Sequence, residues 1–156
     1  MNESFLLENK EIQKENQHIY YYTAGILDSC GNITIRKDGK SKNSVFAYVE
    51  IKSEKETNLK IIQEIFGGKL RKVGNKYYLV WSHRKALNFI KEIIDYLIIK
   101  KDEAQLIIQL YGDKFTRQYE TQRKKDIVKK LIEIKGLKAH KWEKGNCSIQ
   151  KWLNEK

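Results

Sequence analysis

Asp28 and Cys30 lie two positions apart near the end of the segment Tyr22–Gly31, and their side chains could bind a cation or a partner group. A carboxylate offers the hard oxygen ligands that magnesium prefers, whereas a thiol is a soft ligand. The segment is typical of a helix that stops at Gly31 and passes directly into a strand. The helix macrodipole disfavours a carboxylate near a C-terminus by about 0.3–1 kcal/mol. We therefore expect a compensating partner for Asp28, either a backbone amide or a lysine.

Small residues line one face of this predicted helix. Gly25 and Ser29 are four positions apart, so they share a face, and Ala24 adjoins it. A face of this kind lets another helix approach closely. The sequence has one such segment and no internal repeat, so a second copy of the chain related by two-fold symmetry could cover the face. The alternative is a helix that packs within its own monomer.

The charge of the chain favours a polyanionic partner. The 156 residues include 31 Lys and Arg against 20 Asp and Glu, a net charge of +11, and nucleic acid is the default partner for such an excess. The alternative is a charge that serves solubility. No apolar run approaches the roughly 18 residues of a spanning helix, and no signal peptide is recognisable. Two cysteines suggest neither a disulfide framework nor a zinc site, so we expect an intracellular protein of the cytoplasm, nucleoid or an organelle matrix.

Hydrophobic periodicity predicts alternating helices and pairs of strands. Helices are expected from about residue 19 and over 54–66, 83–97, 103–111, 116–137 and 148–153, and strands over 32–37, 44–52, 69–73 and 76–81. Ser82 is the expected N-cap of the third helix, and Leu79 and Trp81 are expected to share the outward sheet face with Tyr77. Three parts follow: an N-terminal extension (1–17), a core domain (18–111) and a basic helical C-terminal extension (112–156), which holds 13 basic and 6 acidic residues.

The sequence T-A-G-I-L-D-S-C-G at residues 23–31 resembles the signature of the LAGLIDADG homing endonucleases. The match falls on Ala24, Gly25, Asp28 and Gly31, with Ile26 and Leu27 as conservative apolar variants. The resemblance extends over about residues 20–111, where the predicted element order is also that of the family. It implies an α+β fold of the order αββαββα, with a saddle-shaped four-stranded antiparallel sheet and helices on one face. The helical C-terminal tail would be added to this core.

The resemblance also implies a homodimer that binds double-stranded DNA. The signature helices of the two copies would meet through Tyr21, Ala24, Gly25, Asp28 and Ser29. The sheet would read base edges in the major groove, while lysines at turns and strand ends would bind phosphates. The alternative is a solvated sheet face. The expected DNA-binding residues are Asn32, Thr34, Arg36, Lys37, Lys40, Lys42, Tyr48, Glu50, Lys52, Lys69, Arg71, Lys72, Lys76, Tyr77 and Lys100.

The expected catalytic centre departs from the family pattern. In that family the last acidic residue of the signature holds the catalytic metal, and Cys30 stands at this position. A neutral thiol supplies no anionic oxygen for magnesium, and Ser53–Glu54 stands where the family often has Gln–Lys. The alternative for Cys30 is a small buried apolar residue. We assign no catalytic residue and no metal, and keep Asp28 and Lys100 as candidates, with Asp28 as the magnesium ligand if the protein cuts DNA.

These observations together predict a sequence-specific DNA-binding homodimer that has lost cleavage and acts as a regulator, for example of transcription. One alternative is an active magnesium-dependent homing endonuclease that cuts a long pseudo-palindromic site. A second is a maturase, whose partner would be intron RNA. A third is an interaction module without a nucleic-acid partner, with its basic faces serving solubility.

Overall fold

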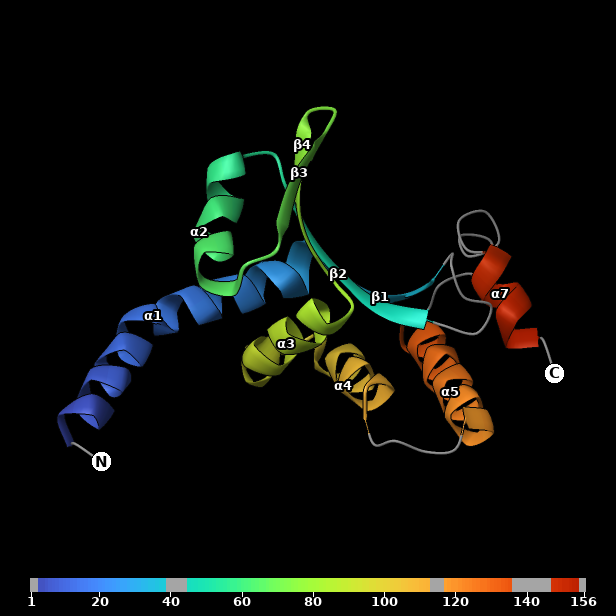
Figure 1. Cartoon of the computed structure of the whole chain (residues 1–156). Helices are drawn as coiled ribbons and strands as arrows, with labels where there is room; N and C mark the ends of the chain where they lie inside the picture. Colours follow the sequence, from blue (N-terminus) through green and yellow to red (C-terminus); the bar gives the residue numbers. More distant parts are fainter. Residues whose placement is uncertain (1–2, 39–44, 113–116, 136–146, 155–156) are drawn as a thin grey trace.

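The computed structural model of the chain describes residues 3–38, 45–112, 117–135 and 147–154. Its elements are α1 (Glu3–Cys30), β1 (Gly31–Lys37), β2 (Val45–Ser53), α2 (Glu56–Phe66), β3 (Lys69–Val73), β4 (Lys76–Ser82), α3 (Arg84–Ile93), the 3-10 turn η1 (Ile94–Tyr96), α4 (Lys101–Leu110), α5 (Arg117–Lys135) and α7 (Cys147–Asn154). The expected α+β order is confirmed, with a four-stranded sheet and helices packed against it (Figure 1). No described helix is both long and apolar enough to cross a membrane.

The sheet is antiparallel and has the strand order β1-β2-β4-β3. Helices α1 to α4 lie on one side of this curved sheet, and we call the opposite side the open face (Figure 1). The register places polar and apolar residues on different sides, as period-two alternation requires. The open face carries Asn32, Thr34, Arg36, Phe46, Tyr48, Glu50, Lys52, Lys69, Arg71, Val73, Lys76, Tyr78, Val80 and Ser82.

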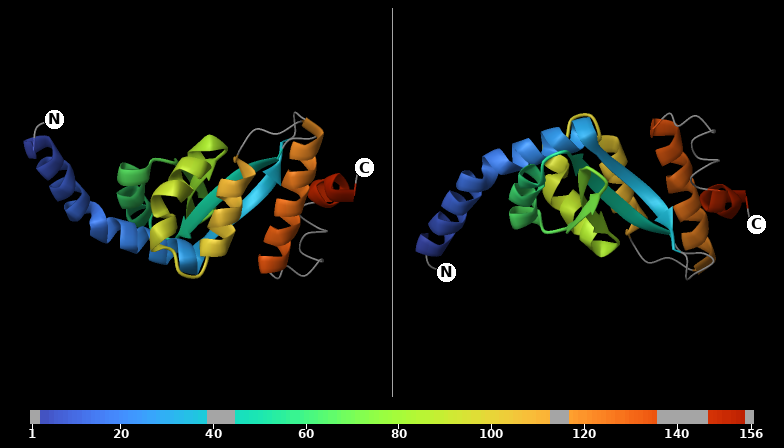
Figure 2. Two further views of the ribbon diagram at one scale, coloured as in Figure 1. Left: turned by 90° about the horizontal axis from the view of Figure 1, so that it is seen from below. Right: turned by 90° about the horizontal axis from the view of Figure 1, so that it is seen from above.

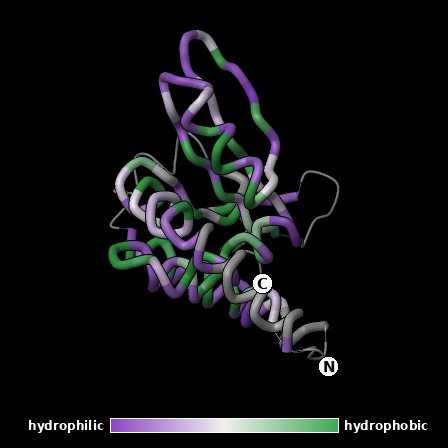
Figure 3. The backbone as a smooth tube through the Cα atoms, turned by 90° about the vertical axis from the view of Figure 1, so that its left-hand side faces the viewer, coloured by the Kyte–Doolittle hydropathy of each residue, from purple (hydrophilic) through white to green (hydrophobic). Residues whose placement is uncertain are grey.

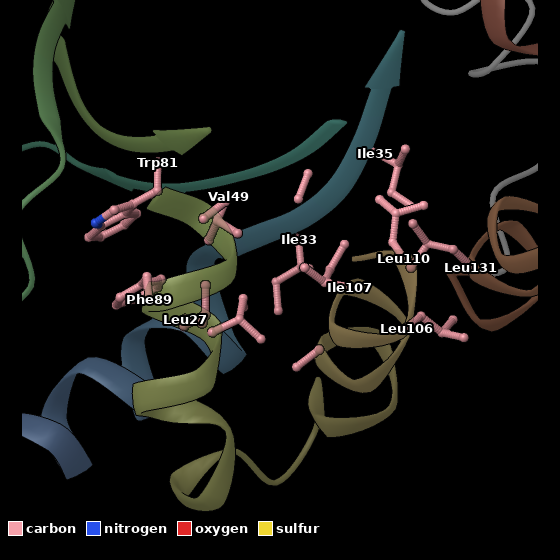
Figure 4. Packing of buried hydrophobic residues seen from close by; sticks show 14 of the residues in the cluster. Leu27, Ile33, Ile35, Val49, Trp81, Phe89, Leu106, Ile107, Leu110 and Leu131 are labelled. Carbon is pink, nitrogen blue, oxygen red and sulfur yellow. The ribbon is translucent and has the colours of Figure 1, made fainter. Parts of the chain in front are cut away.

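The core lies between the sheet and the helices (Figure 4). Leu27 of α1, Ile33 of β1 and Ile107 of α4 are fully buried there. Trp81 of β4 stacks on Phe89 of α3 with 3.9 Å between ring centroids. The apolar stripes of α3 and α4 face the sheet as their spacing predicted. Burial of each such side chain contributes about 1.5–3 kcal/mol to stability.

The prediction for the faces of β4 is wrong. Leu79 and Trp81 face the helices and are almost completely buried, and Tyr77 shares that side. The indole of Trp81 donates a hydrogen bond to the carbonyl oxygen of Phe66 at 3.1 Å. The gain from burying two large apolar side chains decides the orientation of the strand. Tyr78 therefore occupies the place on the open face that was expected for Tyr77.

Two helix boundaries differ from the predictions. The expected helix from about residue 19 begins at Glu3, so α1 continues through the N-terminal extension and leads away from the sheet (Figure 2). The polar run there contains Glu, Lys and Gln, which are good helix formers. The N-cap of α3 is His83, with φ of 56°, instead of Ser82, and the His83 side chain makes no capping hydrogen bond. The 3-10 turn η1 replaces its predicted last turn.

The C-terminal extension packs against the rest of the fold. Helix α5 lies beside α4, and α7 lies beside β1 (Figures 1 and 2). Leu131 of α5 meets Leu110 of α4 and Ile35 of β1 in the interior (Figure 4). Trp152 of α7 is also buried in this cluster. The extension therefore shares one continuous hydrophobic core with the sheet.

Gly31 allows α1 to turn directly into β1. A Cβ atom at this position would lie 2.4 Å from Leu27 Cδ1 and 2.7 Å from the Leu27 carbonyl oxygen. These distances are shorter than any van der Waals contact, so only glycine fits. The turn brings the last residues of α1 and the first residues of β1 to one edge of the molecule.

Candidate nucleic-acid interface

The carboxylate of Asp28 binds the backbone of the segment that leads into α4. Its Oδ2 accepts hydrogen bonds from the amides of Ile98 at 2.9 Å and Ile99 at 3.2 Å, and its Oδ1 accepts one from the amide of Lys100 at 2.9 Å. The Lys100 ammonium in turn donates to the backbone carbonyl oxygen of Asp28 at 2.7 Å. The expected backbone amides therefore compensate the carboxylate at the helix end, while the lysine binds the backbone of the same residue.

Cys30 is the last residue of α1, and its side chain is exposed. The alternative that treated it as a small buried residue is therefore wrong for the described chain. Its sulfur lies 3.5 Å from the hydroxyl of Ser29, a contact with a neutral donor. Among the described residues, no group of three or more His, Cys, Asp or Glu side chains is placed to hold a metal ion. The helix end thus presents a thiol beside a carboxylate whose two oxygens already accept hydrogen bonds.

Two arginines of the open face are held by one tyrosine. Tyr48 of β2 is 6% exposed and lies between them. The guanidinium of Arg36 lies over the Tyr48 ring, 3.5 Å from its centroid. Arg71 of β3 donates a hydrogen bond to the Tyr48 hydroxyl at 2.9 Å. Both guanidinium groups are themselves exposed, so they are positioned on the open face with donors available.

The remaining predicted DNA-binding residues fall into several places. Lys52 and Lys69 are exposed on the open face, and Lys76 lies there at the end of the β3–β4 hairpin. Figure 3 shows this hairpin rising above the helices with hydrophilic and hydrophobic residues in alternation. Tyr77 lies on the helix-covered side of the hairpin, so its expected placement on the outward face is wrong. Lys72 is paired with Tyr77 and lies next to the end of β3. The other predicted positions are Asn32, Thr34 and Glu50 on the open face, Lys37 at the end of β1, Lys100 at the N-cap of α4, and Lys40 and Lys42 outside the described residues.

An exposed apolar patch lies along α1. Tyr21 is 59% exposed, and its ring contacts Tyr96 of η1 with 5.1 Å between centroids. Ile98 and Ile99, which the Asp28 carboxylate holds by their amides, are 86% and 74% exposed. Gly25 lies between these two contact points on α1, and a Cβ added there would meet no atom within 4 Å. Two other residues of the predicted dimer interface differ, because Ser29 is exposed whereas Ala24 is buried in its own chain.

Comparison with known proteins finds this architecture in solved structures. The homing endonuclease I-CvuI in complex with its target aligns with a TM-score of 0.67 and 17% identity, over 88% of this chain and 96% of that chain. The archaeal intron-encoded homing endonuclease I-Vdi141I, complexed with DNA, aligns with a TM-score of 0.63 and 18% identity, over 88% and 98%. The LAGLIDADG homing endonuclease I-GzeII, in complex with a DNA target, aligns with a TM-score of 0.60 and 19% identity, over 81% and 48%. No protein-family model and no curated protein sequence matches the chain.

The chain has the LAGLIDADG fold. This result confirms the fold that the resemblance implied, and the alignments cover up to 91% of the chain. The end of the signature helix lies where α1, β1 and α4 meet. Cys30, Asn32 and Lys100 lie close to this end of α1.

A lysine of α5 joins this group and was not predicted from the sequence. Lys135 donates a hydrogen bond from its ammonium to Oδ1 of Asn32 at 2.7 Å. The pKa of Lys135 is lowered to about 8, mainly by burial and further by the charge of Lys100, while the carboxylates of Glu103 and Glu50 partly offset this lowering. Burial raises the pKa of Glu103, and its Oε2 has no hydrogen-bond partner in the described part of the LAGLIDADG fold. The only local signal of Lys135 was its position in a basic helix, which many neighbours share.

Proposed function

We propose that this protein is a homodimer that binds double-stranded DNA sequence-specifically through the open faces of its two sheets and does not cut it. The observation that carries the proposal is the cluster of Arg36, Tyr48 and Arg71 on the open face. Solved structures of the same fold are described as complexes with DNA, which supports the same class of partner. The role would be that of a regulator in an intracellular compartment that holds DNA.

The arginine cluster suits base reading for a physical reason. A guanidinium can donate two hydrogen bonds to O6 and N7 of guanine in the major groove, which admits a two-stranded ribbon. Arg36 and Arg71 are each held by Tyr48 before DNA binds, so less side-chain entropy is lost on binding. Lys52 and Lys69 are exposed around them and suit phosphates.

The exposed patch along α1 supports the homodimer. Glycine inside a helix costs about 1 kcal/mol relative to alanine. No described residue requires a glycine at position 25, because a Cβ added there would meet open space. Its small size is explained if a second α1 helix approaches there. Such an approach would also cover Tyr21, Ile98 and Ile99, each of which gains about 1.5–3 kcal/mol when fully buried.

We propose that the protein does not cut DNA because of the side chains at the C-terminal end of α1. Magnesium-dependent hydrolysis of a phosphodiester needs anionic oxygen ligands close to the scissile phosphate. Cys30 supplies none, and the Asp28 oxygens already accept three backbone hydrogen bonds. We therefore propose no metal cofactor. The lysine that remains there, Lys100, can contact a phosphate without catalysing its transfer.

The DNA-binding proposal is tested by selecting duplexes from a random library with the full-length protein and measuring affinity against salt. With six to ten phosphate contacts, affinity should fall about 10³–10⁵-fold between 50 and 200 mM salt. Arg36→Ala and Arg71→Ala should each relax preference at particular base pairs, whereas Lys69→Ala should weaken binding uniformly. Affinity that does not fall with salt would contradict the proposal. Structured RNA that competes better than the selected duplex would instead indicate an RNA partner.

Cleavage is tested separately on the selected duplex with magnesium or manganese. We expect no strand scission by the wild-type protein. Restoration of cutting by Cys30→Asp would show that a single missing carboxylate accounts for the loss. Wild-type cutting that Asp28→Asn abolishes would overturn the proposal and identify an active endonuclease.

The homodimer is tested by sedimentation equilibrium of the full chain. Ile98→Glu and Ile99→Glu should shift the protein to a monomer, since each places a charge in the proposed interface. Ile61→Glu is the matched control, because Ile61 is an exposed isoleucine of α2, 44% exposed, outside the patch. A wild-type monomer at micromolar concentration, with and without DNA, would refute the dimer.

A further inference from the structure

Lys135 reaches Asn32 across 103 positions of the sequence. An ammonium can only donate hydrogen bonds, so the atom of Asn32 that it contacts must be the amide oxygen. The distance between Lys135 Nζ and Asn32 Oδ1 is 2.7 Å, typical of a charge-assisted bond. This contact determines how the Asn32 amide is turned: its oxygen points to Lys135, and its NH₂ group points elsewhere.

Lys135 is itself partly buried, among charged groups from α4 and β2. The carboxylates of Glu103 on α4 and Glu50 on β2 attract it, and Lys100 at the start of α4 repels it. Its pKa of about 8 leaves it protonated at neutral pH, so it acts as a donor there. The ammonium is therefore a built part of the edge where α4, α5 and the sheet meet.

Asn32 belongs to the open face. It is the first residue after Gly31, it is paired with Glu50 in the sheet, and it is partly exposed. No described residue accepts a hydrogen bond from its amide nitrogen. Asn32 therefore presents two donors on the face that we propose to bind DNA, with a cation directly behind its oxygen.

We propose that Lys135 is a positioning residue that makes Asn32 a donor to guanine instead of a reader of adenine; this rests on the proposed DNA-binding function. An unconstrained asparagine reads adenine by donating to N7 and accepting from the N6 amino group. Here the adenine amino group would approach Oδ1 of Asn32, which already accepts a hydrogen bond from the Lys135 ammonium. The adenine amino group and the ammonium are both donors and would face each other. Guanine offers acceptors at both N7 and O6, which suit the amide donors and the nearby positive charge.

The test starts from the duplexes selected by the full-length wild-type protein. Asn32→Ala first identifies the base pair in each half-site at which discrimination is lost. Lys135→Met should then shift the preference at this base pair from guanine towards adenine by about fivefold or more. Lys135→Arg, which keeps donors, should retain guanine. Lys129→Met is the matched control, since it removes one exposed charge from the same helix and should leave the preference at this base pair unchanged.

A second measurement uses the wild-type protein alone. Raising the pH from 7 to 9 removes the proton from most Lys135 side chains, because their pKa is about 8. The preference at the same base pair should move towards adenine, as in Lys135→Met. This measurement needs no substitution, so it applies even if Lys135→Met does not fold.

The outcomes separate the two proposals. If neither the wild type nor any variant enriches a duplex, the proposed DNA-binding function fails. If the wild type selects a site but Asn32→Ala changes no base pair, Asn32 does not read DNA and the inference fails alone. It also fails if the wild-type preference is the same at pH 7 and pH 9, or if folded Lys135→Met selects the same base as Lys129→Met.

Discussion

Replacing Asp28 by asparagine should destabilise the fold, because the carboxylate holds three backbone amides. An asparagine oxygen at the Oδ2 position can keep the bonds from Ile98 and Ile99. Its NH₂ group would then face the amide of Lys100, so one bond to a charged acceptor is lost, about 1.5–3 kcal/mol. The segment is partly exposed, and we therefore expect about 2 kcal/mol, which lowers Tm by about 4–8 °C in a chain of this size.

Thermal and urea unfolding followed by circular dichroism measure this effect. Asp95→Asn is the matched control, since Asp95 is an exposed carboxylate of η1 that makes no side-chain hydrogen bond to another described residue. Its Tm should stay within about 1 °C of the wild type. If Asp28→Asn has the same Tm as Asp95→Asn, the Asp28 carboxylate has no structural role. Loss of metal-dependent cutting in such a stable variant would then show that Asp28 serves catalysis.

Three further predictions concern the open face, a glycine and the buried lysine. Tyr48→Phe keeps the ring under Arg36 but loses the hydroxyl that binds Arg71, so DNA affinity should fall about fivefold, and more in Tyr48→Leu, as measured by fluorescence anisotropy. Gly68→Ala should cost more than about 1 kcal/mol in urea unfolding, because φ is +100° and the new Cβ would lie 2.9 Å from Trp81 Cε2. From pH 7 to 9 the unfolding free energy of the wild type should rise by about 1 kcal/mol relative to Lys135→Met. The folded state, in which the pKa of Lys135 is about 8, loses its proton before the unfolded state, whose pKa is the ordinary 10.5.

Much of the fold could be predicted because it rests on local periodicity. The alternation of Ile33 and Ile35 and the stripe of α3 each identified a buried face, and these residues are in the core. Strand β4 shows the limit of such patterns. Tyr77, Leu79 and Trp81 alternate with Tyr78 and Val80, so both faces are apolar and periodicity cannot say which is inside. Pairing with β2 and contact with Phe66 decide it.

The sequence by itself determined the helix that stops at Gly31 and the presence of Asp28 and Cys30 near its end, because these depend on residue types at adjacent positions. Only the tertiary structure decided what surrounds them. The amides that hold Asp28 come from 70 to 72 positions away, and the lysine that turns Asn32 comes from 103 positions away. Packing of the helices on the sheet sets these contacts, and no local sequence pattern specifies which distant residue will form them.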